Sequence, residues 1–213
     1  PAQLDELFSV EGANQVLFSD RVIFAEGKTE RELVPDLFEA HHGVAPADRR
    51  IGFVPVEGSG NIDKCLKVLT QMGIPARAVV DLDFAFRQAS KCKLIDANDA
   101  DVATCKALCA GIAAANGGTI GGDGFFEKAN REVCFEKLAA DTHASSAIQS
   151  LHAKLKAKGI WLWTGGAIEF HLGMAGKDHE AWRSMRKGLR SKGIAAAKDH
   201  TTVGACMKWL AGE

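Results

Sequence analysis

The sequence predicts an α/β protein with a parallel sheet, flanking helices and a helical insertion. Three short apolar segments alternate with segments of helical period over residues 1–87. An Ala-rich region of helical period follows over 88–157, and another apolar segment comes after it. Strands that alternate with helices form parallel sheets through right-handed crossovers. We therefore expect a core built from 1–87 and 158–213, interrupted by the insertion 88–157.

The elements of the first part follow from apolar spacing and turn residues. Segment 21–26 is an apolar run of the kind found in strands buried on both faces. Segment 29–41 has apolar residues at helical spacing. A second strand over 51–56 precedes a helix over 61–73, which begins at a capping Asn and stops at a Gly. The third strand covers 76–81.

The second part contains the insertion and the end of the core. Within 88–157, the glycine-rich stretch 117–124 predicts a flexible loop between helices. A fourth strand is expected at 160–163, and two closing helices at 178–191 and 201–210.

Composition places the chain among cytoplasmic globular proteins. Apolar residues make up 46% of it, enough for a sizeable core, and no apolar run has the length of a membrane span. Residues 1–12 show no signal-peptide pattern. No two of the six cysteines form a CxxC pair, which favours buried reduced thiols and leaves a structural zinc site as the alternative. The start at a Pro suggests a fragment of a longer protein.

Charge is unevenly distributed along the chain. Residues 1–100 hold 11 basic and 16 acidic side chains, whereas residues 151–213 hold 11 basic and 5 acidic ones. An acidic part beside a basic part suits a metal site next to a polyanion. Two ordinary solvated faces would give the same counts.

Acidic residues follow three of the expected strands, at the edge where ligands of open parallel sheets bind. Glu26 ends the first strand, and Glu30 lies one helical turn later. Asp81 and Asp83 end the third strand, and their spacing puts both side chains on one side of an extended backbone. Glu169 follows the fourth. Clustered carboxylates repel one another unless a cation neutralises them, and hard oxygen ligands select Mg²⁺ or Mn²⁺. For each acid alone, a solvated residue near a helix N-terminus is the alternative.

Four motifs resemble the Toprim (Rossmann-like) domain of OLD (overcoming lysogenisation defect) nucleases. They are VIFAEGKTE (22–30), VEGSGN (56–61), VVDLD (79–83) and GGAIE (165–169). The glutamate-glycine and Asp-x-Asp pair is the general Toprim signature, and the other features narrow it to the OLD branch. The resemblance covers about 21–87 and 160–192.

The resemblance implies a nuclease that nicks or cleaves duplex DNA with two Mg²⁺ or Mn²⁺ ions. It makes Glu26, Glu30, Asp81, Asp83 and Glu169 metal ligands or their neighbours, with Glu26 and Asp81 central to catalysis. It also implies a late catalytic lysine, for which we expect Lys187 first and Lys177 second. An N-terminal ABC-type ATPase module of the same full-length protein is the implied partner.

The stretch around 183–192 is a candidate for contacts with the DNA backbone, and an ordinary exposed helix face is the alternative. Its basic residues are Arg183, Arg186, Lys187, Arg190 and Lys192.

Two other functional classes remain open from the sequence. One is a receiver-like domain phosphorylated on Asp81, in which Glu169 and the insertion would have no place. The other is a non-catalytic Toprim module for DNA binding or assembly. The chain has no tyrosine, so it lacks the nucleophile of Toprim topoisomerases, and hydrolysis by water is the expected chemistry.

Overall fold

The computed structural model describes residues 13–56 and 58–213, which form two compact units. The first unit combines the described residues up to Val80 with Ile168–Glu213. The second contains Asp81–Ala167 and so encloses the insertion expected over 88–157. Segment 1–12, which lacks a signal-peptide pattern, and Glu57 of the VEGSGN motif lie outside the described residues.

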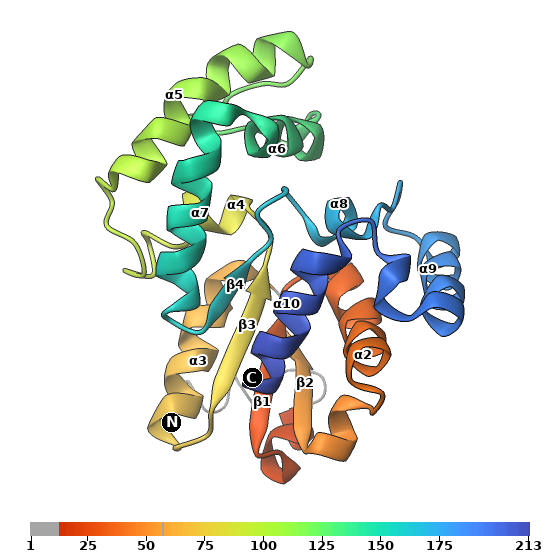
Figure 1. Ribbon diagram of the computed structural model, residues 1–213. Helices are drawn as coiled ribbons and strands as arrows, with labels where there is room; N and C mark the ends of the chain where they lie inside the picture. Colours follow the sequence, from red (N-terminus) through yellow and green to blue (C-terminus); the bar gives the residue numbers. More distant parts are fainter. Residues whose placement is uncertain (1–12, 57) are drawn as a thin grey trace. The chain divides into compact units, whose positions relative to one another are not determined.

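A parallel sheet forms the centre of the first unit, where the strand order is β2-β1-β3 (Figure 1). In the first unit, β1 (Arg21–Ala25) pairs in parallel with both β2 (Ile51–Pro55) and β3 (Ala76–Val80). Val22 therefore lies opposite Gly52 on one side and Ala76 on the other. Each of these strands ends one residue before its expected boundary, and the predicted α/β class is confirmed.

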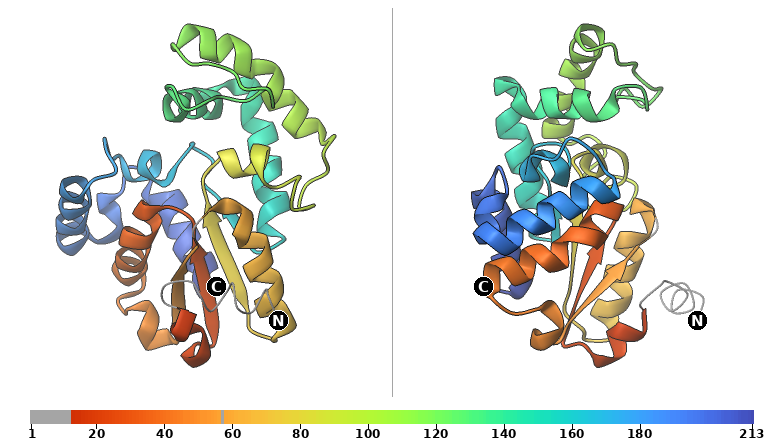
Figure 2. Two further views of the ribbon diagram at one scale, coloured as in Figure 1. Left: turned by 180° about the vertical axis from the view of Figure 1, so that it is seen from behind. Right: turned by 90° about the vertical axis from the view of Figure 1, so that its right-hand side faces the viewer.

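Two crossover helices cover opposite faces of these three strands. Helix α2 (Lys28–His42) connects β1 to β2, and α3 (Ile62–Gln71) connects β2 to β3. The first connection leads from β1 to its neighbour β2, and the second leads back past β1 to β3, in the opposite direction. Right-handed crossovers therefore place the two helices on opposite sides of the sheet. The right-hand view of Figure 2 shows α2 on one side of the strands and α3 on the other.

Buried apolar side chains from β1 and α2 form the centre of the first unit. Val22, Ile23, Phe24 and Ala25 are fully buried, which explains the uninterrupted apolar run of β1. The apolar stripe of α2 packs onto this layer through Leu33, Val34, Leu37 and Phe38. No helix within 13–56 and 58–213 is both long and apolar enough to cross a membrane.

Short 3₁₀ segments join several elements of the first unit. They are η1 (Ala13–Phe18), η2 (Pro46–Arg49), η3 (Ser59–Asn61) and η4 (Gly193–Ala196). Segment η3 runs directly into α3, which makes the expected capping role of Asn61 wrong. With φ −90° and ψ −17°, Asn61 is already helical, and its side chain makes no capping bond. An N-cap residue needs an extended backbone to reach the free N–H groups.

Three helices complete the first unit: α8 (Ile168–Leu172), α9 (His179–Lys192) and α10 (His200–Ala211). The two longer ones were predicted to within two residues at each end. Asp178 caps α9 by accepting a hydrogen bond from Ala181 N, and Asp199 caps α10 through Thr202 N.

The second unit is mainly helical. It contains α4 (Asp83–Arg87), α5 (Ala100–Ala115), α6 (Arg131–Ala140), α7 (Thr142–Lys156) and the strand β4 (Ile160–Leu162). An aromatic cluster joins α4 to α6: the ring of Phe86 stacks on Phe125 at 4.8 Å and on Phe135 at 5.9 Å between centroids.

All six cysteines lie within the described residues and outside any disulfide, and five of them are buried, whereas Cys92 is half-buried. Burial raises the pKa of both Cys105 and Cys109 to about 12. A thiol that holds its proton at neutral pH is a poor nucleophile and a poor metal ligand. The expected burial of the thiols therefore holds for five of the six cysteines.

Candidate active site

Glu26 and Glu30 flank the junction between β1 and α2 in the first unit. Glu26 directly follows β1 and is half-buried, with its Oε2 atom fully enclosed. Glu30 lies in the first turn of α2, where only 2% of the residue is exposed. The free N–H groups at a helix N-terminus favour negative charge there. The carboxylate of Glu30 is therefore held inside the protein at the end of a strand.

Gly27 separates these two acids because of the space that Glu30 needs. The φ and ψ angles of Gly27 are −91° and 163°, which any residue adopts, so no turn requires a glycine here. A Cβ atom at this position would instead collide with a carboxylate oxygen of Glu30. Gly58, by contrast, has φ 82° and does need a glycine.

Glu169 is the third acid of the first unit, and a lysine lies beside it. It sits in α8 with 8% of the residue exposed. Lys177 Nζ lies 3.6 Å from Glu169 Oε2. That oxygen is buried, and no hydrogen-bond donor reaches it from the described residues. A buried carboxylate oxygen that no hydrogen-bond donor reaches can bind a metal cation, because a cation compensates the negative charge.

Asp81 and Asp83 belong to the second unit, and their expected geometry is wrong. Strand β3 ends at Val80, Leu82 has helical angles (φ −59°, ψ −32°), and Asp83 begins α4. The backbone between the two acids is thus a helical turn and not an extended strand. A hydrogen bond of 2.7 Å from Leu82 N to Gly166 O fixes this turn. Asp81 keeps a buried Oδ1 atom, and Asp83 pairs with Arg131 at 3.7 Å.

The five acids divide between the units, three in the first and two in the second. In the part of the chain that the structure describes, no three His, Cys, Asp or Glu residues form a group that could hold a metal ion. The donor chemistry nevertheless fits Mg²⁺ or Mn²⁺, because all candidate ligands are carboxylates and one has a buried oxygen without a hydrogen bond.

The two candidate lysines differ in their surroundings. Lys177 lies in the loop after α8 and contacts Glu169, as described above. Lys187 lies on α9, is exposed, and forms no ion pair with the described residues. The residue expected second, Lys177, is therefore the one found beside a candidate acid.

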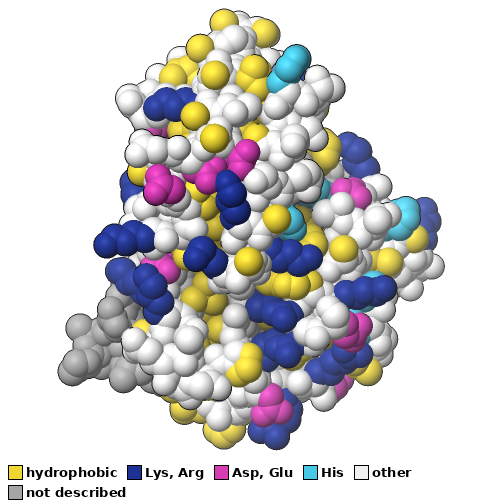
Figure 3. All heavy atoms as spheres, turned by 60° about the vertical axis from the view of Figure 1, so that its left-hand side comes forward, with side chains coloured by type: hydrophobic (Ala, Val, Ile, Leu, Met, Phe, Trp, Pro, Cys, Tyr) yellow, Lys and Arg dark blue, Asp and Glu magenta, His cyan; other side chains and the backbone are white. Residues whose placement is uncertain are grey.

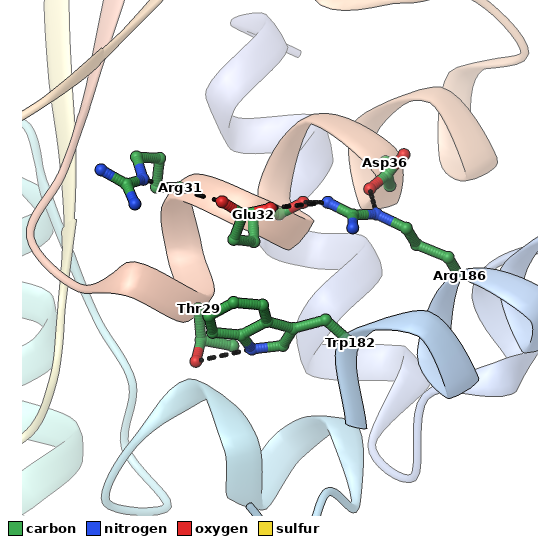
Figure 4. A network of polar contacts seen from close by, with 6 residues as sticks. All are labelled: Thr29, Arg31, Glu32, Asp36, Trp182 and Arg186. Carbon is green, nitrogen blue, oxygen red and sulfur yellow. Dashed lines mark hydrogen bonds and ion pairs between the residues drawn. The ribbon is translucent and has the colours of Figure 1, made fainter. Parts of the chain in front are cut away.

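Arg186, expected among the DNA contacts, instead fastens α9 to α2 (Figure 4). Its Nε donates to Asp36 Oδ2 at 2.7 Å, and its Nη2 donates to Glu32 O at 2.6 Å and Glu32 Oε2 at 3.0 Å. Asp36 and then Glu32 raise the pKa of Arg186 above its ordinary value. A guanidinium forks between two acceptors, which explains why an arginine occupies this position.

The other four basic residues of 183–192 are exposed on α9: Arg183, Lys187, Arg190 and Lys192. They remain candidates for contacts with a polyanion. Figure 3 shows the molecule turned so that the left-hand side of Figure 1 comes forward. On the face seen there, Lys and Arg side chains outnumber Asp and Glu side chains.

Two polar pairs of the first unit, one buried and one part-buried, were not predicted. Trp182 Nε1 donates to Thr29 Oγ1 at 3.3 Å (Figure 4), and Thr29 directly precedes the buried Glu30 in the chain. His171 Nδ1 lies 2.9 Å from Asp199 Oδ2 and links α8 to α10. Each pair joins residues at least 28 positions apart in the chain, so no local pattern announces either of them.

The His171–Asp199 pair has a defined charge balance. Burial lowers the pKa of His171, although the hydrogen bond to Asp199 acts in the opposite direction. Burial alone would raise the pKa of Asp199, but hydrogen bonds from His171 and Thr202 hold it below the ordinary value. The imidazole is therefore neutral at pH 7 and donates its Nδ1 proton to a carboxylate. This pair fixes the helix that carries Glu169.

Comparisons with known proteins found one family and one relative that are similar to this chain. Residues 17–83 match the family described as overcoming lysogenization defect protein-like, TOPRIM domain. The chain is also similar to the Old nuclease of Escherichia phage P2, with 28% identity over 219 aligned residues that cover 98% of this chain. The alignment covers 36% of that nuclease, so this chain spans about a third of the length of its relative. Four of the five acids fall within 17–83, and Glu169 lies beyond it.

Proposed function

We propose that this chain, an OLD-family Toprim protein, is a divalent-metal-dependent endonuclease that hydrolyses DNA phosphodiester bonds. The observation that carries the proposal is the match over 17–83, which includes the four acids after β1 and β3. Similarity to a protein named a nuclease supports the reaction class. We infer the metal dependence, the nicking of duplex DNA and the choice of metal ligands.

In this proposal, the five candidate carboxylates supply the ligands of two Mg²⁺ or Mn²⁺ ions. These acids are Glu26, Glu30, Asp81, Asp83 and Glu169. Ions bound there would lower the pKa of a water molecule and offset charge on the departing oxygen. Glu26 and Asp81 directly follow β1 and β3, and we assign them the central ligand roles.

The protein's own cation has a separate task. Charge builds on the non-bridging phosphate oxygens as water attacks, and a lysine beside the site offsets it. The contact between Lys177 and Glu169 supports Lys177 in this role over Lys187. Hydrolysis forms a bond from the water oxygen to phosphorus, breaks the bond to the 3′ oxygen, and leaves that oxygen protonated.

We also propose that the full-length protein carries an ABC-type ATPase module that delivers DNA to this part. The chain spans about a third of the phage nuclease, which leaves room in such a protein for further domains. Activity of the isolated chain is then expected to be weak, and an assay with high sensitivity is needed.

Nicking of supercoiled plasmid tests the proposal. Purified protein should convert supercoiled to open-circular DNA with Mn²⁺ or Mg²⁺ and fail to do so in EDTA. Asp81→Ala and Glu26→Ala should each reduce the rate by at least about 100-fold, in the range that metal-held transition-state charge accounts for. Glu39→Ala, which removes an exposed acid from α2, is the matched control and should leave the rate unchanged.

Two results would contradict the nuclease. Equal activity of Asp81→Ala, Glu26→Ala and the wild type would locate the chemistry elsewhere. Metal-independent DNA binding without cleavage would identify a non-catalytic Toprim module. Incubation with an acyl-phosphate donor tests the receiver-like alternative, since a nuclease gains no phosphoryl mass on Asp81.

A further inference from the structure

The helical insertion presents a cation to one of the candidate acids. Arg131 is the first residue of α6, and its Nη1 atom lies 3.7 Å from Asp83 Oδ2. The side chains of Arg131 and Asp83 are 36% and 24% exposed. The pair therefore lies at the surface of the second unit, where a large anion can reach it.

The packing of α4 against α6 holds this pair in register. Asp83 and Phe86 are three residues apart on α4, and Arg131 and Phe135 are four residues apart on α6. Residues at these spacings share one face of a helix. The rings of Phe86 and Phe135 stack at 5.9 Å with an interplanar angle of 4°. The aromatic stack and the ion pair are thus neighbouring contacts between the same two helix faces.

The backbone before α6 is also fixed. Asn130 has φ 51°, a left-handed conformation that Asn tolerates better than most residues. Its side-chain amide donates to Asn116 O at 3.1 Å and to Gly117 O at 3.2 Å. These bonds tie the start of α6 to the end of the preceding helix, so the direction in which Arg131 leaves the backbone is defined.

The ion pair uses only part of what the guanidinium offers. Arginine carries five N–H donors, and a single contact of 3.7 Å to one carboxylate oxygen leaves most of them available. A planar guanidinium binds phosphate well, because two parallel N–H groups match two of its oxygens, as they do for a carboxylate. Asp83 therefore holds the guanidinium in place, and the remaining N–H donors of Arg131 can bind a second anion.

We propose that Arg131, a residue of the helical insertion, binds a phosphate of the DNA backbone. This contact positions the DNA next to Asp83. This inference rests on the proposed function and adds a substrate contact from outside the matched segment 17–83. Arg131 and a divalent cation also compete for the Asp83 carboxylate. The insertion then contributes directly to substrate binding by the Toprim domain.

Binding measurements on the whole chain test this role without relying on cleavage. Fluorescence anisotropy with a labelled DNA duplex would be recorded over a salt series, with Ca²⁺ in place of Mg²⁺, for the wild type, Arg131→Ala, Arg131→Lys and Lys137→Ala. Lys137 is an exposed basic residue on a different face of α6 and serves as the matched control. Arg131→Ala should bind about 10-fold more weakly, and its slope of log K against log salt should fall by about 0.9.

The remaining variants separate a substrate contact from a structural ion pair. Arg131→Lys should restore the salt slope but only part of the affinity, because an ammonium cannot fork between two oxygens. Lys137→Ala should match the wild type. Mn²⁺ titrated calorimetrically should bind Arg131→Ala at least as tightly as the wild type, since a competing cation has been removed. A merely supporting role for Arg131 predicts weaker Mn²⁺ binding and an unchanged salt slope.

Two outcomes would overturn the inference: an unchanged salt slope in Arg131→Ala, or an equal loss in Lys137→Ala. Both leave the nuclease proposal intact, provided that the wild type binds and nicks DNA. A wild type that does neither contradicts the proposed function itself. Thermal melting of each variant identifies misfolding, and Arg131→Lys keeps the test decisive if Arg131→Ala fails to fold.

Discussion

Removal of the Arg186 side chain should weaken the attachment of α9 to α2. Arg186→Ala deletes three hydrogen bonds, to Asp36 Oδ2, Glu32 Oε2 and Glu32 O. Charge-assisted bonds contribute about 1.5–3 kcal/mol each when buried, and exposed ion pairs about 0.2–1 kcal/mol. The three side chains are between 28% and 37% exposed, so we expect an intermediate total loss of about 1.5–3 kcal/mol of unfolding free energy.

Thermal unfolding followed by circular dichroism measures this loss. For a chain of this size, each kcal/mol corresponds to a melting temperature lower by about 2–4 °C. Arg186→Lys should recover less than half of the loss, because one ammonium cannot hold both carboxylates and the carbonyl. Arg183→Ala removes an exposed arginine from the same helix and should change stability by less than about 0.5 kcal/mol.

High salt should reduce the contribution of Arg186 to stability. The difference between Arg186→Ala and the wild type should shrink in 1 M NaCl, where charges are screened beyond about 3 Å. A wild-type melting temperature for Arg186→Ala would refute the attachment that the contacts indicate. An equal effect of Arg183→Ala would show that the helix face as a whole, and not this network, stabilises the unit.

Three further predictions concern the site and its surroundings. Gly27→Ala should lower the free energy of unfolding in urea by about 1–3 kcal/mol, because the new methyl group displaces the Glu30 carboxylate. In a Glu30→Ala background the same substitution should cost almost nothing, and an equal cost in both backgrounds would contradict this explanation. Lys177→Ala should slow plasmid nicking by at least about 10-fold, while Lys187→Ala should not; the reverse order would favour the exposed lysine on α9. Iodoacetamide at pH 8 should modify only Cys92 in the folded protein and all six cysteines in guanidinium chloride, as intact mass would record. Rapid labelling of Cys105 or Cys109 in the folded protein would contradict their raised pKa.

The elements that the sequence predicted well are those whose signals are local. The apolar run of β1 indicated a strand covered on both faces, and its residues Val22, Ile23, Phe24 and Ala25 are indeed fully buried. Asp178 and Asp199 each precede a closing helix and cap it. Such patterns need no knowledge of distant segments, since a strand's burial and a helix's first turn are both written in consecutive residues.

Local rules failed where a distant partner decides the backbone or the side chain. The spacing of Asp81 and Asp83 suggested an extended strand, yet Leu82 N bonds to Gly166 O and the chain turns into α4. Arg186 belonged to an apparently uniform basic stretch, but acids 150 and 154 positions earlier bind it. Both corrections come from contacts that only the folded chain creates.

By itself, the sequence determined the α/β class, the order of the elements and the acids that follow the strands. It could do so because buried faces show as periodic apolar residues and helix starts show as capping residues. Only the tertiary structure decided how single charged side chains are used. It placed Lys177 beside Glu169, Arg131 beside Asp83 and Arg186 between Asp36 and Glu32. The physical reason is that a charge acts through the groups within a few ångströms of it, and those groups are brought there by folding.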